Sequence, residues 1–273
     1  MTYEAITFER IGPVALVTLN RPEMLNALNK TLQDDSRAAC AEVEADDSIR
    51  VMVVTGAGRA FCAGADLGSG ADTSRSEDND TPPATAPQAQ RLDEYGWIGR
   101  QAMAFYRMTK PTIAAVNGAA VGAGMSLSLA CDLRIGTPNT RMRTTFIERN
   151  LSPDSGMSWL LPRIVGYSKA VDLMFTSRDI RGEEALTLGL VDRFVPADRL
   201  IEESLALAND IAKWPPLAMR AAKRTIQRNM LVDLEEALRN ETFGHVFSRR
   251  APKDAAESRA SFFEQRPPRF TGE

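Results

Sequence analysis

The chain has 273 residues and a formal net charge of −3, with 44% hydrophobic and 25% charged residues. This composition is ordinary for a globular protein with one large domain or a core domain with a smaller appendage, and it does not favour nucleic-acid binding. No apolar run approaches the ~18 residues that a membrane span needs, and residues 1–10 lack a signal-peptide core. We therefore expect a cytoplasmic protein with no nucleic-acid or membrane partner.

Strands alternate with helices through the first part of the chain. Residues 6–10 and 14–20 alternate apolar with polar side chains and are joined at Gly12-Pro13, which is typical of a hairpin. A short β-branched run at 51–55 ends at glycines and predicts a buried strand. The other elements expected here are a helix over 30–43, a helix over 91–108, a strand over 112–116 and a helical run from 122 to 131.

The second part of the chain is mainly helical. Short strand candidates lie at 133–136, 143–146 and 190–194, and residues after Pro196 read as helix to about Glu264. The alternation predicts an α/β fold with parallel pairing over residues 1–196, followed by a helical region over 197–273. Residues 68–90 are rich in Ser, Asp, Thr, Pro and Ala, and they predict either a surface excursion or a lid over an active site.

Histidine and cysteine are scarce. His245 is the single histidine, so a histidine-rich metal site is excluded, and no Gly-x-Ser-x-Gly turn accompanies it. Cys40, Cys62 and Cys131 are far apart, and we expect buried, reduced thiols, with Cys62 a small filler side chain. We therefore expect no metal, and chemistry that depends on backbone donors and carboxylates.

Two segments rich in small residues follow predicted strands, at 61–67 and 117–126. Glycine and alanine there would let a ligand's carbonyl oxygen approach backbone N–H groups, and a helix N-terminus adds unpaired donors and a favourable dipole. Taken singly, each segment is better explained by tight packing. Together they resemble the crotonase family, the enoyl-CoA hydratase/isomerase superfamily. The segments that carry this resemblance, in order, are Asn20-Arg21-Pro22 with Asn26-Ala27-Leu28, then 60–67, 116–124, 161–166, 185–191 and Phe263 to Pro267.

The resemblance implies a crotonase spiral of ββα repeats over 1–196 and a C-terminal helical oligomerisation region over 197–273, in a homotrimer or homohexamer. It implies an acyl-CoA substrate, with coenzyme A as part of the substrate and no cofactor, and an oxyanion hole made by the backbone N–H groups of Ala63 and Ala123. Losing one such donor typically costs ~2.7–4 kcal/mol. The substrate-binding residues that it implies are Met24, Leu25, Ala27, Ala65, Asp66, Leu67, Gly122 and Phe146.

The resemblance also bears on the reaction. Hydratases of the family use two glutamates, and the matching positions hold Ser126 and Phe146, which cannot act as carboxylate bases. Asp154 instead resembles the single acid of the isomerase branch, most closely of ring-1,2-epoxyphenylacetyl-CoA isomerases and Δ3-Δ2-enoyl-CoA isomerases. An apolar lining by Phe146 and Met125 would raise the pKa of its carboxyl. The alternative for Asp154 is a helix N-cap.

Three other functions stay open: a hydratase with a different acid, a thioesterase, and an acyl-CoA-binding homologue without turnover. Glu148 reads as a solvated charge, and Asp66 and Asp132 read as structural acids at turns. A late cluster of basic residues predicts either a solvated helix face or contacts to the phosphates of coenzyme A. These residues are Lys213, Arg220, Lys223 and Arg224.

Overall fold

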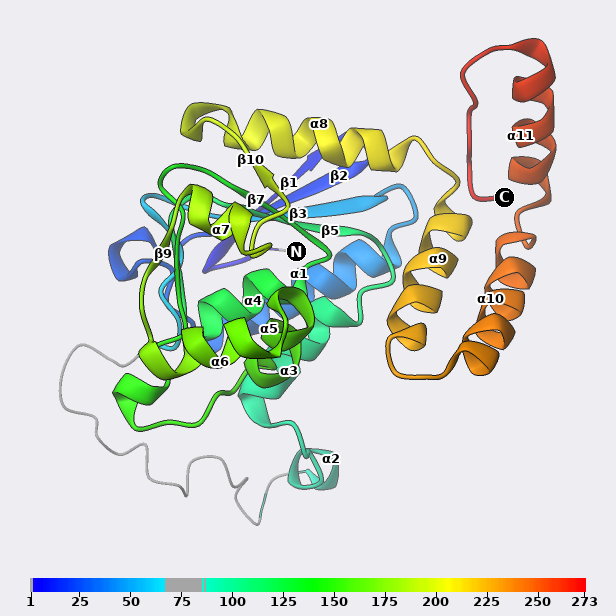
Figure 1. The fold of residues 1–273 in the computed structure, drawn as a ribbon. Coiled ribbons are helices and arrows are strands. Elements are labelled where there is room, and N and C mark those ends of the chain that lie inside the picture. The colour runs from blue at the N-terminus through cyan, green and yellow to red at the C-terminus, as the bar shows by residue number, and fades with distance from the viewer. Residues whose placement is uncertain (1, 67–84, 86) are drawn as a thin grey trace.

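A computed structural model describes residues 2–66, 85 and 87–273 (Figure 1). Its strands are β1 (Ile6–Ile11), β2 (Val14–Leu19), β3 (Val51–Gly56), β4 (Ala60–Cys62), β5 (Thr112–Val116), β6 (Ala119–Val121), β7 (Leu133–Gly136), β8 (Arg141–Arg143), β9 (Ile180–Arg181) and β10 (Arg193–Phe194). Its helices are α1 (Lys30–Ala45), α2 (Gln88–Arg91), α3 (Gly96–Tyr106), α4 (Ala123–Ala130), α5 (Met157–Val165), α6 (Tyr167–Thr176), α7 (Glu183–Thr187), α8 (Leu200–Ala212), α9 (Pro216–Asn229), α10 (Leu234–Ser248) and α11 (Pro252–Glu264).

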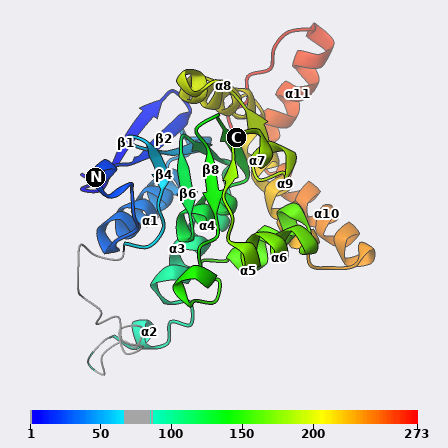
Figure 2. The ribbon, with the colours of Figure 1, turned by 60° about the vertical axis from the view of Figure 1, so that its left-hand side comes forward.

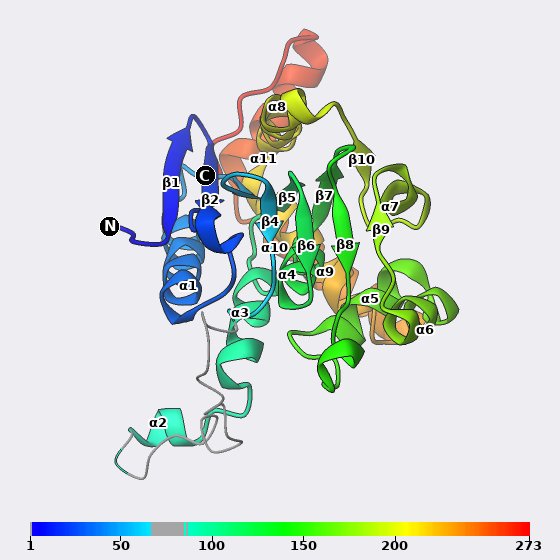
Figure 3. The same cartoon turned by 90° about the vertical axis from the view of Figure 1, so that its left-hand side faces the viewer.

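The strands form a six-stranded sheet, in the order β1-β2-β3-β5-β7-β10, and a four-stranded sheet, in the order β4-β6-β8-β9. From β3 to α5 the chain repeats one unit: a strand in the large sheet, a strand in the small sheet, then a helix. Consecutive units add parallel neighbours to both sheets, so β4, β6 and β8 lie side by side (Figure 3). The expected α/β spiral of ββα repeats is confirmed.

Alternation along the central strands divides the core between the two faces of the large sheet. On β3, Val51 and Val53 pack under α8, whereas Met52 and Val54 face the larger cluster that contains α1, α4 and α5. Figure 1 shows α8 covering one face of the sheet and these helices covering the other. Every residue of α4 is buried, and this helix contacts β4 and β6, so the small-residue segments lie where the small sheet meets α4.

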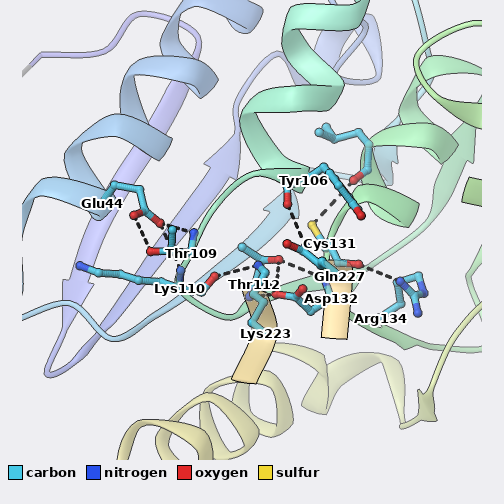
Figure 4. A network of polar contacts seen from close by, with 11 residues as sticks. Glu44, Tyr106, Thr109, Lys110, Thr112, Cys131, Asp132, Arg134, Lys223 and Gln227 are labelled. Atoms are coloured by element: carbon cyan, nitrogen blue, oxygen red, sulfur yellow. Dashed lines mark hydrogen bonds and ion pairs between the residues drawn. The ribbon is translucent and has the colours of Figure 1, made fainter. Parts of the chain in front are cut away.

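The C-terminal helices extend away from the sheets. Helices α9 and α10 pack against each other, and α11 lies at the outer end of the chain (Figures 1 and 2). Polar contacts join α9 to the body, including Lys223 Nζ with Asp132 Oδ2 at 2.6 Å and Gln227 Nε2 with the Tyr106 carbonyl at 3.0 Å (Figure 4). None of the described helices is both long and apolar enough to cross a membrane.

Several boundaries differ from the sequence predictions. The strand expected over 143–146 is wrong, because β8 ends at Arg143 and Thr145 has a φ of 60° that breaks the extended backbone. The helix expected from 91 begins at Gly96, whose φ is also 60°. The three-residue strands β4 and β6 were missed, since they are too short to show alternation. Most of the expected 68–90 excursion lies outside the described residues.

Candidate active site

The loop that connects β2 to α1 is fixed by a fully buried asparagine. Asn26 Oδ1 accepts from the Arg21 N–H at 2.9 Å, and its Nδ2 donates to the carbonyls of Ala57 (2.9 Å) and Ala60 (2.8 Å). Its φ of 57° lies in the left-handed region, which asparagine tolerates better than most residues. Asn26 thus holds the predicted substrate-binding residues Met24, Leu25 and Ala27 against the turn between β3 and β4. The sequence motif contained Asn26, but its role was not predicted.

A second contact joins this loop to the segment after β4. Arg21 Nη1 donates to Asp66 Oδ2 at 2.9 Å and to the Ala27 carbonyl at 2.6 Å. The side chain of Asp66 is therefore structural, as the sequence indicated. Predicted contacts to coenzyme A at Asp66 would use its backbone, and Leu67 lies outside the described residues.

The assignment of Ala63 as an oxyanion donor needs correction. Its N–H already donates to the Leu25 carbonyl at 3.0 Å. Two residues on, Ala65 forms a parallel bridge with Leu28: the Leu28 N–H donates to Gly64 O (2.7 Å), and the Asp66 N–H donates to Leu28 O (3.1 Å). In such a bridge the N–H of the central residue points to the opposite side. The Ala65 N–H has no hydrogen-bond partner among the described residues, so Ala65 is the better donor.

Ala123, the second predicted donor, lies at the start of α4. Ala123 is the first residue of this helix, so its N–H has no intrahelical partner, and Gly122 precedes it with a φ of 52°. Gly64, beside Ala65, has a φ of 97°, and a Cβ there would lie 2.7 Å from Val121 O and 3.6 Å from the Ala123 nitrogen. The Ala65 and Ala123 segments are therefore adjacent, as an oxyanion hole requires.

Gly124 sets how closely these two segments approach. A Cβ at this position would lie 2.1 Å from the carbonyl oxygen of Cys62. No side chain can occupy that space without moving the backbone of β4 or α4. All three cysteines are free and buried, and burial raises the pKa of the Cys62 thiol to about 12, so this residue fills space and is no nucleophile.

Asp154 lies in the turn before α5. Burial raises the pKa of its carboxyl, and the only partner of the carboxylate in the described part of the chain is Ser155, whose Oγ donates at 2.9 Å. The alternative role as an N-cap is wrong: Gly156, with a φ of 79°, precedes α5, and no side chain caps that helix. Asp154 is therefore a partly buried carboxylate with neither a cation partner nor a capping role among those residues.

The remaining candidates behave differently. Phe146 is 5% exposed and belongs to the same apolar cluster as Met125 and Ala123. Glu148 forms an ion pair with Arg143, and a hydrogen bond from Ser177 lowers its pKa, so it is no base near neutral pH. The late basic residues have partners within the chain: Lys213 pairs with Asp210, Arg220 with Glu44, Lys223 with Asp132, and Arg224 lies over the Phe247 ring.

A repeated ββα spiral whose Ala65 and Ala123 segments are adjacent defines the class of α/β fold to which the chain belongs. The enoyl-CoA hydratase/isomerase family matches residues 9–273, and the chain belongs to this family. A probable enoyl-CoA hydratase of Mycobacterium bovis is 37% identical over 99% of both chains. An enoyl-CoA hydratase structure from Bacillus anthracis superimposes with a TM-score of 0.86, at 32% identity over 99% of this chain and 100% of that one.

One of the similar structures is named as an isomerase and not as a hydratase. A monofunctional enoyl-CoA isomerase from Mycobacterium smegmatis superimposes with a TM-score of 0.71, at 32% identity over 86% of this chain and 98% of that chain. Relatives that carry the two activity names thus share this architecture at similar identity. The choice between the activities therefore depends on the side chains around the paired donors.

Proposed function

We propose that the protein is an enoyl-CoA isomerase, acting on an unsaturated or ring-derived acyl-CoA, in which Asp154 is the single acid–base group. The observation that carries the proposal is the environment of this carboxyl. Burial raises its pKa, and no cation of the described residues opposes that shift. A base with a raised pKa accepts a carbon-bound proton more readily near neutral pH.

The reaction needs one proton to move between two carbons. The Asp154 carboxylate removes a proton from the carbon next to the thioester of a 3-enoyl-CoA, and the electron pair spreads through the carbonyl and the double bond as a dienolate. The N–H groups of Ala65 and Ala123 stabilise the negative oxygen, Ala65 taking the place first given to Ala63. The protonated Asp154 then returns the proton two carbons away, which yields the 2-enoyl-CoA. No cofactor other than the coenzyme A of the substrate takes part.

A hydratase is the second candidate, because most of the similar proteins named above are called hydratases. Hydration needs a group that activates water as well as one that delivers a proton to carbon. Ser126 and Phe146 offer no carboxylate for either task, which favours the isomerase. Asp154 alone would have to perform both steps of a hydration.

One experiment separates the candidates. The protein is incubated in heavy water with a 3-enoyl-CoA or a 2-enoyl-CoA, and products are followed by mass spectrometry, with Asp154→Asn in parallel. Migration of the double bond, without addition of water and lost in the variant, supports the isomerase. Addition of water that survives Asp154→Asn contradicts the role given to this residue. Absence of both reactions, together with tight acyl-CoA binding, indicates a homologue without turnover.

We also propose that residues 197–273 form the oligomerisation region of a homotrimer or homohexamer. Support comes from large apolar side chains that α9 to α11 expose and that a monomer would leave in water. Phe262 and Phe263 are 76% and 80% exposed, and Leu234 is 74% exposed. Covering such a surface with further copies of the chain would remove it from solvent.

A further inference from the structure

Two buried polar side chains near the paired donors lack hydrogen bonds. Gln101 is 4% exposed, and neither Oε1 nor Nε2 has a partner in the part of the chain that the structure describes. Ser126 is 1% exposed, and its Oγ also lacks a partner there. Buried polar groups in folded proteins are nearly always hydrogen-bonded, to protein, water or ligand. These two side chains therefore need a hydrogen-bonding partner that the described residues do not provide.

Both side chains border the proposed reaction site. Ser126 follows Ala123 by three residues on α4, so the two share a helix face and are separated by a rise of about 4.5 Å. Gln101 lies on the buried face of α3 with Phe105, and Ala102 Cβ is 3.8 Å from where a Cβ on Gly156 would lie. This turn of α3 thus lies against the Asp154 loop, and α3 packs on α4 (Figure 1).

We infer that Gln101 and Ser126 bind a neutral oxygen substituent of the acyl group, a hydroxyl, ether or carbonyl, a few carbons from the thioester. An amide and a hydroxyl each supply a donor and an acceptor and carry no charge, which suits an oxygen of this kind. A purely hydrocarbon chain would leave both groups unsatisfied, and such sites reject analogues that lack the polar group. The inference rests on the proposed function in placing the acyl chain along α4.

Calorimetric titration with saturated, unreactive ligands tests the inference. The ligands are hexanoyl-CoA and its 4-, 5- and 6-hydroxy derivatives, offered to the wild-type protein and to Gln101→Met and Ser126→Ala. Wild type is expected to bind at least one hydroxylated ligand about tenfold more tightly than hexanoyl-CoA. Each variant should lose that preference while still binding hexanoyl-CoA. Ser128→Ala is the matched control, because the Ser128 hydroxyl already donates to the Met125 carbonyl.

The outcomes separate this inference from the proposed function. Equal binding of all four ligands, or a preference that survives in both variants, overturns the inference and indicates that internal water satisfies Gln101 and Ser126. Hexanoyl-CoA would still bind in that case, so the proposed function stands. Failure of every acyl-CoA to bind contradicts the proposed function itself, and the inference falls with it. Binding is measured without turnover, so a missing isomerase activity does not obscure the result.

Discussion

Lys223 Nζ on α9 lies 2.6 Å from Asp132 Oδ2, two residues after the end of α4 (Figure 4). Only 9% of the lysine side chain is exposed, and Nζ also donates to the Lys110 carbonyl at 3.0 Å. Asp132 in turn accepts from the N–H and Oγ of Thr112. The ion pair thus links the C-terminal helices to β5 and to the helix whose first residue is the proposed donor Ala123.

Lys223→Met should therefore destabilise the protein by about 1–3 kcal/mol, because it leaves the Lys110 carbonyl and Asp132 without their shared partner. Urea unfolding at one fixed protein concentration measures the change. Lys213→Met is the control: its ion pair with Asp210 is largely exposed and should contribute little. Equal effects of the two substitutions would show that the buried ion pair does not hold α9.

The carboxyl of Asp154 predicts a characteristic dependence of stability on pH. A raised pKa in the folded state means that the ionised form destabilises the fold above that pKa, and the penalty disappears as the pH falls below the unfolded value of about 3.9. Asp154→Asn should therefore raise the melting temperature at pH 7, by roughly 2 °C. The gain should shrink in acid. If Asp154→Asn is less stable than wild type at pH 7, burial of the ionised Asp154 carboxylate does not destabilise the fold.

The same shift governs activity. Proton abstraction needs ionised Asp154, so the acidic limb of kcat/KM should fall at a pH above the ordinary carboxyl pKa of about 3.9. Rates measured from pH 4 to 9 with a 3-enoyl-CoA locate the limb. Glu148→Gln should leave the limb in place, since the Glu148 pKa is lowered by its Ser177 and Arg143 contacts. If the limb moves in this variant, the group that titrates is Glu148 and not Asp154.

Substitutions at α4 distinguish a backbone donor from a side-chain role. Ala123→Gly keeps the N–H and should retain most activity. Gly124→Ala places a Cβ at the Cys62 carbonyl, separates the paired donors, and should lower kcat by about 10²–10³. Far-ultraviolet circular dichroism checks that Gly124→Ala is folded. Full activity in a folded Gly124→Ala protein would argue against the assigned pair of donors.

The exposed aromatic side chains of α11 are expected to lie in a subunit interface of the proposed oligomer. Replacing Phe262 and Phe263 by serine should lower the mass measured by analytical ultracentrifugation, because an interface would lose its largest apolar contacts. Phe175→Ser on α6 is the matched control, since this phenylalanine is 71% exposed outside the C-terminal region. An unchanged mass in the double variant places the interface elsewhere.

Long periodic segments were predicted correctly from the sequence. The helix expected over 30–43 is α1, and the hairpin at Gly12-Pro13 joins β1 to β2, because both patterns depend on local burial. The choice between Ala63 and Ala65 could not be made in this way. It depends on which way each peptide faces, and the parallel bridge to Leu28, distant in sequence, sets that direction.

The environment of Asp154 likewise could not be predicted from the local sequence pattern. Proline, aspartate, serine and glycine before a helix are typical of an N-cap, yet the left-handed backbone at Ser155 and Gly156 moves the carboxylate away from the helix end. The lack of a side-chain partner for Gln101 among the described residues likewise depends on what packs around α3. Such properties arise between elements, so a single segment does not encode them.

The proposed oxyanion donors belong to peptide groups, and this affects which parts of the site can change by mutation during evolution. Of the single codon changes possible at Ala65 and Ala123, only the change to proline removes the N–H, so the proposed donors are retained through the other substitutions there. The acid at residue 154, and the groups at 126 and 146, change with one codon each. New reactions can thus arise on this scaffold by exchange of proton-transfer groups, while its capacity to stabilise an enolate is passed on intact.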